Sequence, residues 1–126
     1  MTGVDDLLAK ARARLRRITA SDAATEQAGG ALLVDIRPSD ERAGNGDIPG
    51  AVVIDRNVLE WRLDPTSPWR SPLIRDHHQR VILICGQGYQ SSLAAANLQE
   101  MGLVNATDVI DGFVGWLAAD LPVRKG

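Results

Sequence analysis

Short runs of apolar residues recur along the chain, and several are separated by segments with helical spacing. Residues 31–34, 51–54 and 81–84 are uninterrupted apolar runs, and residues 107–110 form a weaker fourth run. Runs of this length, rich in β-branched residues, are typical of strands that are buried on both faces. We therefore predict a strand at each of these places.

Helical patterns lie between several of the predicted strands. The clearest covers residues 91–101, where apolar residues recur on one face and Gly102 supplies a C-cap. Shorter helices are predicted over residues 39–43, 57–63 and 113–119. Strands that alternate with helices indicate an α/β domain with a mainly parallel sheet.

The N-terminal region is predicted to be helical as well. Over residues 4–18, apolar side chains share one face and arginines occupy the other, and Ser21 is a plausible N-cap for a short helix that ends near residues 29–30. A helix that packs on the domain is favoured over one that binds a partner or a membrane. We take residues 1–20 as a helical extension and residues 21–126 as the domain.

Residues 64–80 contain three prolines and no strong periodicity, which predicts a surface loop. The chain of 126 residues suits one domain, and its 44% hydrophobic and 24% charged residues are ordinary for a globular protein. The net charge of -2 gives no electrostatic reason for a nucleic-acid or anionic membrane partner. No apolar run approaches the ~20 residues of a membrane span. The charged N-terminus is unlike a signal peptide, and a single cysteine suits a reducing compartment, so we expect a cytoplasmic protein.

In open α/β sheets the functional crevice lies at the carboxyl ends of the strands. Asp35 and Arg37 follow the first predicted strand, Arg56 follows the second and Cys85 follows the third. A structural salt bridge or turn is favoured for Asp35 and Arg37 over a role in orienting a catalytic loop. For Arg56, a place in the site and an ion pair with Glu60 at i,i+4 are equally plausible.

The segment after Cys85 leads straight into a predicted helix. Glycine allows the backbone to curl, so that successive N–H groups form a nest for an anion, and the start of the helix adds its own free N–H groups. A lone cysteine is usually a small buried hydrophobe, but this setting favours a thiolate, a persulfide anion or a bound oxyanion. The predicted nest consists of Gly86, Gln87, Gly88, Tyr89, Gln90 and Ser91.

Two chemistries compete for such a loop. A tyrosine-phosphatase-type loop needs an arginine six residues after the cysteine to clamp the phosphoryl oxygens. Ser91 stands at that position, and no arginine occurs from residue 86 to residue 123. This favours sulfur transfer, in which the thiolate takes an outer sulfur and passes it on. Because the chain has one cysteine, the acceptor must be another molecule.

Several blocks together resemble the rhodanese-like domain family. The sequence VDIR near the start is similar to the family's Asp-Val-Arg signature, and DIPGA is similar to its His-Ile-Pro-Gly-Ala turn, with Asp47 in place of histidine. The strand and loop around Cys85 match the family's active-site segment. The resemblance extends over about residues 21 to 123, and its further blocks are residues 98–102 and 109–116.

The resemblance implies the rhodanese fold, an α/β domain whose central, mainly parallel sheet of about five strands has helices on both faces. It also implies a sulfurtransferase or sulfane-sulfur carrier, with a persulfide on Cys85 and loop amides that stabilise the sulfur anion, and we expect no bound cofactor. No metal site is expected either, because His77 and His78 are adjacent and no other His or Cys has ligand spacing. Many thiosulfate-using members carry a basic residue where Gln90 stands. Polysulfide or a protein persulfide therefore gains weight as donor over thiosulfate. The alternatives are a non-catalytic binding or regulatory module and, less favoured, a Cys-dependent phosphatase.

Overall fold

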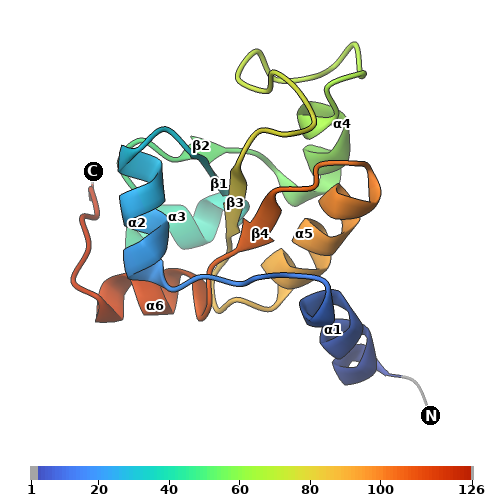
Figure 1. Cartoon of the computed structure of the whole chain (residues 1–126). Helices are drawn as coiled ribbons and strands as arrows, with labels where there is room; N and C mark the ends of the chain where they lie inside the picture. The colour runs from blue at the N-terminus through green and yellow to red at the C-terminus, as the bar shows by residue number, and fades with distance from the viewer. Residues whose placement is uncertain (1–2, 126) are drawn as a thin grey trace.

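In the computed structural model, which describes residues 3–125, helices and short strands alternate along the chain (Figure 1). The elements are α1 (Val4–Ala13), α2 (Ala20–Ala28), β1 (Leu32–Asp35), α3 (Ser39–Asn45), β2 (Val52–Val53), the 3-10 turn η1 (Arg56–Val58), α4 (Leu59–Leu63), β3 (Val81–Ile84), α5 (Gln90–Glu100), β4 (Ala106–Asp108) and α6 (Gly112–Ala118).

The strands form one parallel sheet in the order β2-β1-β3-β4. The predicted α/β fold with a parallel sheet is confirmed, with four strands in the described part of the chain rather than about five. Beyond β4 the sheet continues only as a single bridge between Ile18 and Val109. The bridge does not lengthen into a strand because Thr19, the next residue, already caps α2.

Helices cover both faces of the sheet, with α4 and α5 on one side and α2 and α6 on the other (Figure 1). Along β3 the side chains alternate between these faces, as the pleat of a strand requires. Leu83 and Cys85 belong to the core cluster that includes Leu59 of α4 and Leu98 of α5. The opposite cluster contains Ile82, Ile84, Phe113 and Trp116.

The N-terminal helix is shorter than predicted, since α1 ends at Ala13. Leu15 packs against the cluster on the α4 and α5 side, whereas Ile18 packs against the opposite cluster. Apolar residues that pack on opposite faces of a sheet cannot share one helix face, so the helix ends before Leu15 and residues 15–18 are not helical. The cap of α2 is Thr19 rather than Ser21: the Thr19 hydroxyl accepts a hydrogen bond from the amide of Asp22 at 3.1 Å.

Residues 64–80 form a long connection without helix or strand, as predicted. The connection is not wholly a surface loop, because Ser67, Ser71, Ile74 and Gln79 are buried. The side chain of Gln79 joins two parts of this connection. Its Oε1 accepts a hydrogen bond from the backbone N–H of Arg75 at 2.7 Å, and its Nε2 donates to the Leu73 carbonyl at 2.9 Å. No helix within residues 3–125 is long and apolar enough to cross a bilayer.

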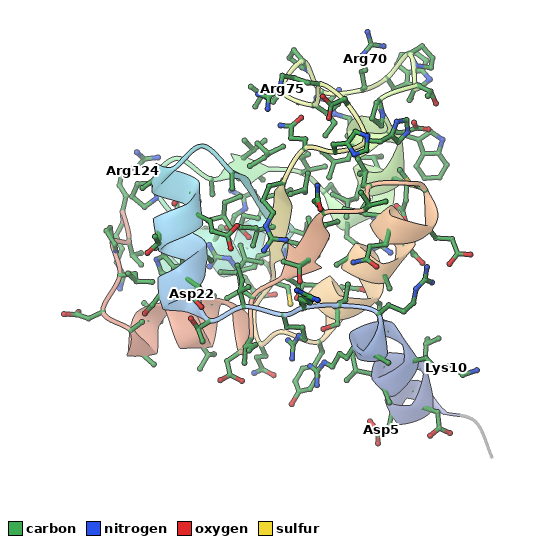
Figure 2. All side chains as sticks on the ribbon, in the orientation of Figure 1. Asp5, Lys10, Asp22, Arg70, Arg75 and Arg124 are labelled. Atoms are coloured by element: carbon green, nitrogen blue, oxygen red, sulfur yellow. The ribbon has the colours of Figure 1, made fainter. Side chains whose placement is uncertain are left out.

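Many charged side chains lie on the outside of the molecule. Figure 2 shows Asp5 and Lys10 projecting from α1, and Arg70 and Arg75 projecting from the long connection. Large apolar side chains are exposed on the same connection and its neighbour α4, among them Trp61 and Trp69.

Candidate active site

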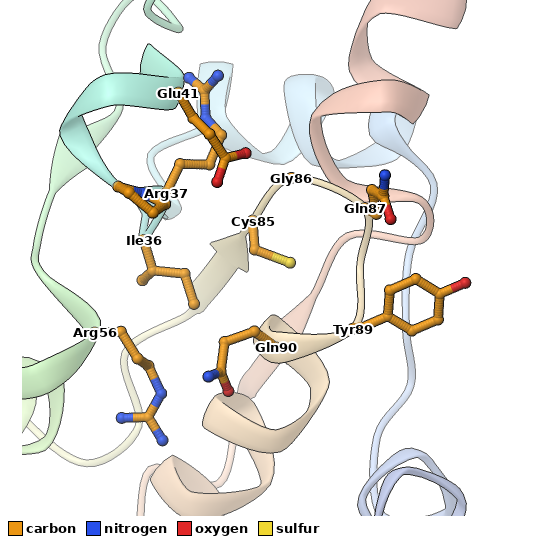
Figure 3. A pocket seen from close by; sticks show the side chains of 10 residues that line it. Ile36, Arg37, Glu41, Arg56, Cys85, Gly86, Gln87, Tyr89 and Gln90 are labelled. Carbon is orange, nitrogen blue, oxygen red and sulfur yellow. The ribbon is translucent and has the colours of Figure 1, made fainter. Parts of the chain in front are cut away.

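Cys85 is the first residue after β3 and lies at the base of a pocket of about 480 Å³ (Figure 3). The residue is 6% exposed, so it is sheltered but open to a small molecule that enters the pocket. The pocket walls come from the turns after β1, β2 and β3. They consist of Ile36, Arg37, Pro38, Glu41, Arg56, Gly86, Gln87, Tyr89 and Gln90.

The loop after Cys85 curls around the sulfur atom. The amide of Gly88 donates to Cys85 Sγ at 3.2 Å, and the amide of Ser91 donates to it at 3.4 Å. Gly88 has a φ of +85°, which side chains rarely tolerate, and a Cβ there would lie 2.8 Å from the Asp111 amide nitrogen. The curl therefore needs a glycine at this position.

The carbonyl groups of the same loop are held from outside by the start of α6. Phe113 donates its amide to the Cys85 carbonyl at 2.8 Å, and Val114 donates to the Gly86 carbonyl at 3.2 Å. Gly112 lies flat against this backbone, because a Cβ on it would meet the Cys85 carbonyl oxygen at 2.4 Å. These bonds hold the first part of the loop against the start of α6.

A buried polar network lies on the other side of the sulfur. The Cys85 thiol donates to Ser91 Oγ at 3.2 Å, and the Ser91 hydroxyl donates to Asp108 Oδ2 at 2.8 Å. Ser92 also donates to Asp108 Oδ2, at 2.8 Å. Asp108 is fully buried, and its charge is balanced by Arg17, whose Nε lies 2.9 Å from Oδ1.

The sequence patterns did not point to Asp108, Ser92, Arg12 or Arg17. A carboxylate inside a predicted buried strand was the one available signal, because such a group needs a partner. The two arginines are distant in sequence and carry no local signal. Arg12 reaches the loop from α1, where it donates to Ser92 Oγ at 3.2 Å and to the Gly88 carbonyl at 2.8 Å.

Asp35 and Arg37 form a buried ion pair, and Arg37 is part of the pocket wall. Arg37 Nη2 lies 2.8 Å from Asp35 Oδ2 and also donates to the Gly46 carbonyl at 2.9 Å. The guanidinium stacks on the Phe113 ring, 3.8 Å from its centroid. Both side chains are almost completely buried, so removing one of them would leave an uncompensated charge. Neither side chain has a hydrogen bond to the sulfur.

Arg56 forms an ion pair with Glu60 and also lies in the pocket wall. Its Nη1 binds both carboxylate oxygens of Glu60, at 2.9 and 3.1 Å, and the residue also lines the pocket with Cys85 (Figure 3). Glu41 lies across the pocket, where a Cβ on Gly86 would meet its Oε1 at 2.8 Å. The arginines of the pocket are thus already paired with acids, and Glu41 adds a negative charge.

No cluster of three or more His, Cys, Asp or Glu residues that could hold a metal ion occurs within the described residues.

A model of the rhodanese-like domain family matches residues 19–119. A protein of unknown function from Rhodopseudomonas palustris, named a possible tyrosine phosphatase, is 31% identical and has a TM-score of 0.88; the match covers 98% of this chain and 96% of that one. A rhodanese-related protein from Thermoplasma volcanium is 27% identical over 86% of this chain and 97% of its own, with a TM-score of 0.66. The polysulfide-sulfur transferase from Wolinella succinogenes is similar in fold, with 23% identity, 94% and 85% coverage and a TM-score of 0.76.

Proposed function

Because this chain belongs to the rhodanese-like domain family, we propose that it is a sulfurtransferase or sulfane-sulfur carrier that holds a persulfide on Cys85. The observation that carries the proposal is the direction of the loop amides. Gly88 and Ser91 donate to Cys85 Sγ at 3.2 and 3.4 Å, at the base of an open pocket. Two amide donors of this kind stabilise an anionic sulfur more than a neutral thiol.

The reaction takes place in two displacements at sulfur. The Cys85 thiolate attacks the outer sulfur of the donor; a new S–S bond forms and the donor's S–S bond breaks. With thiosulfate, the bond's electron pair leaves on sulfite, and the negative charge moves to the outer sulfur of the persulfide. An acceptor thiolate then attacks that outer sulfur, takes it away as a new persulfide and restores the Cys85 thiolate.

Charge in the pocket favours a persulfide donor over thiosulfate. Arg37 is paired with Asp35 and Arg56 with Glu60, so neither brings an uncompensated positive charge. Glu41 adds a carboxylate to the pocket wall. Thiosulfate would bring two negative charges to this carboxylate, whereas an organic or protein persulfide brings one. Polysulfide is the next candidate.

A phosphatase activity is less well supported, although one structural neighbour carries that name. Phosphoryl transfer requires a cation that clamps the equatorial oxygens. At the position of the clamping arginine this chain has Ser91, whose hydroxyl is engaged by Asp108 at 2.8 Å. A non-catalytic module would leave the loop amides around Cys85 without a purpose.

The decisive experiment is an intact-mass measurement. The protein is incubated with thiosulfate, with polysulfide and with a low-molecular-weight persulfide, and its mass is recorded before and after addition of a thiol acceptor. We expect a gain of one sulfur atom that the acceptor removes. Since Cys85 is the only cysteine, Cys85→Ala should remain unmodified.

Controls separate the rival functions. Thermal unfolding shows whether Cys85→Ala is folded, and hydrolysis of an aryl phosphate is measured in parallel. No sulfur adduct with any donor would point to the non-catalytic module. Release of phosphate that is lost in Cys85→Ala would point to the phosphatase.

A further inference from the structure

Two arginines of the N-terminal segment hold the same carbonyl of the sulfur-binding loop. Arg12 Nη2 donates to the Gly88 carbonyl oxygen at 2.8 Å, and Arg17 Nη2 donates to the same oxygen at 2.9 Å. Both arginines precede residue 19, at which the match to the family begins. These contacts are therefore supplied from outside the matched region.

Each arginine has an anchor of its own, so the carbonyl is held in a fixed direction. Arg17 Nε donates to the fully buried Asp108 at 2.9 Å. Arg12 Nε donates to Ser92 Oγ at 3.2 Å, and the Arg12 guanidinium lies over the Tyr89 ring, 5.5 Å from its centroid. The N-terminal segment, the loop and the end of β4 are joined in this way.

The geometry of one peptide unit connects these contacts to the sulfur. The unit between Gly88 and Tyr89 is planar and trans, so its N–H points opposite to its carbonyl. The arginines draw the carbonyl outward, which leaves the Tyr89 N–H on the other side of the unit. Gly88 already donates its own N–H to Cys85 Sγ at 3.2 Å. We therefore expect the Tyr89 N–H to be available to the outer sulfur of a persulfide.

Arg12 also brings a charge that the loop lacks. The side chains of residues 86–91 are uncharged. Arg17 is neutralised by Asp108, whereas no carboxylate among residues 3–125 forms an ion pair with Arg12. A cation that binds the carbonyl of Gly88, whose amide donates to Cys85 Sγ, favours the anionic form of the sulfur.

We propose that residues 4–18 contribute to the sulfur site, with Arg12 as a positioning residue. Arg12 fixes the Gly88–Tyr89 peptide and stabilises anionic sulfur on Cys85, a role that in other loops would fall to a basic residue within the loop itself. The inference rests on the proposed function, which it extends to residues outside the matched region.

Three full-length variants test the proposal. Arg12→Gln removes the charge with little change of shape, and Arg12→Lys keeps the charge but cannot reach Ser92 and Gly88 with one nitrogen. Arg14→Gln is the matched control. Arg14 lies at the C-terminal end of α1, but it pairs with the exposed Glu100 at 2.6 Å rather than with the loop. Each variant is assayed for iodoacetamide alkylation of its cysteine as a function of pH, for the rate of sulfur loading and for thermal unfolding.

For Arg12→Gln we expect the pH midpoint of alkylation to rise and the loading rate to fall about tenfold. Arg12→Lys should recover the midpoint but not the full rate, and Arg14→Gln should behave as the unaltered protein. The proposal is overturned if Arg12→Gln retains both values, or if Arg14→Gln changes them equally. Should Arg12→Gln not fold, an unchanged loading rate in Arg12→Lys would overturn it, and a reduced rate would support it. Alkylation requires no sulfur donor, so its pH profile tests Arg12 even if the protein never forms a persulfide.

Discussion

The hydroxyl oxygen of Ser91 lies 3.2 Å from the sulfur of Cys85 and 2.8 Å from a carboxylate oxygen of Asp108. In the thiol form Cys85 donates to Ser91, which in turn donates to Asp108 at 2.8 Å. A hydroxyl has one proton, so it can serve either the carboxylate or an ionised sulfur. When Cys85 is ionised, Asp108 still accepts from Ser92 and Arg17, which leaves the Ser91 hydroxyl able to turn toward the sulfur.

We therefore expect Ser91→Ala to slow sulfur loading about tenfold or more, because a donor to the anionic sulfur is lost. Stability should fall by about 1–2 kcal/mol as Asp108 loses a buried hydrogen bond. Ser92→Ala is the comparison: it also removes a bond to Asp108 and none to Cys85, but it takes away the acceptor of Arg12 Nε, so we expect its loading rate to fall less than that of Ser91→Ala. Loading rates from single-turnover mass measurements, with urea unfolding of both variants, check this. Equal loading rates in the two variants would remove Ser91 from the mechanism.

Gly112 packs against the backbone of the sulfur-binding loop, and we expect Gly112→Ala to disrupt that loop. Its φ is +53°, and an added Cβ would lie 2.4 Å from the Cys85 carbonyl oxygen and 2.8 Å from the Gly88 nitrogen. Strain of this kind, against backbone that cannot move aside, should cost roughly 3 kcal/mol or more. Gly44→Ala, in α3 with open space around it, should instead be neutral or stabilising by up to about 1 kcal/mol. Urea denaturation of both variants measures the difference, and an equal effect would contradict the account.

The sequence was sufficient to predict the fold because its signals are local. Each strand is a run of apolar residues whose length and composition indicate burial on both faces, as the fully buried β3 shows. The count of about five strands was too high, because the pairing beyond β4 stops at one residue, Ile18. The helix over residues 4–18 was too long, because a periodic pattern cannot reveal that Leu15 and Ile18 serve opposite faces of the sheet.

The site was only partly accessible to sequence reasoning, for a similar reason. Cys85 and its glycine-containing loop are contiguous, so their spacing indicates a nest. Arg17 and Asp108 are 91 residues apart, and Arg12 and Gly88 are 76 residues apart. Partners at such separations are determined by the topology of the sheet and by the way in which the N-terminal segment crosses its edge.

Glu41 should discriminate between sulfur donors. Its carboxylate lies beside Gly86 in the pocket wall, where it repels an anionic donor. We expect Glu41→Gln to raise kcat/KM for thiosulfate about three- to tenfold, mainly through KM, because screened charges at such distances contribute about 1 kcal/mol. The effect with a singly charged organic persulfide should be smaller. Asp40→Asn, a neighbouring exposed acid outside the pocket lining, is the control. A gain that is equal for both donors would show that charge repulsion is not the cause.

Arg56 is paired with Glu60 and also lines the pocket, so two substitutions should have opposite effects on KM for thiosulfate. Arg56→Ala should raise KM for thiosulfate several-fold, because the pocket loses a cation. Glu60→Gln should lower it, because the guanidinium is then freed from a bidentate partner at 2.9 and 3.1 Å. Steady-state kinetics of both variants check this. Thiosulfate kinetics that are unchanged in Arg56→Ala would remove this residue from the site.

The ion pair between Glu26 of α2 and Arg80, which precedes β3, should make a small part of the stability dependent on pH. Hydrogen bonds from Arg80, at 2.7 and 3.1 Å, lower the pKa of Glu26 below its usual 4.5, against a smaller opposing effect of burial. A carboxyl whose pKa is lowered by folding stabilises the folded protein above its ordinary pKa, and this stabilisation is lost as the pH falls through the folded value. Both side chains are about one-third exposed, which weakens the ion pair. We therefore expect the free energy of unfolding at pH 7 to be only about 0.5 kcal/mol higher for the unaltered protein than for Glu26→Gln. Urea denaturation at pH 7 and at several values below 4.5 should show the difference narrowing as the pH falls. Salt should reduce the difference at pH 7. A difference that widens in acid would have the wrong sign for this pair.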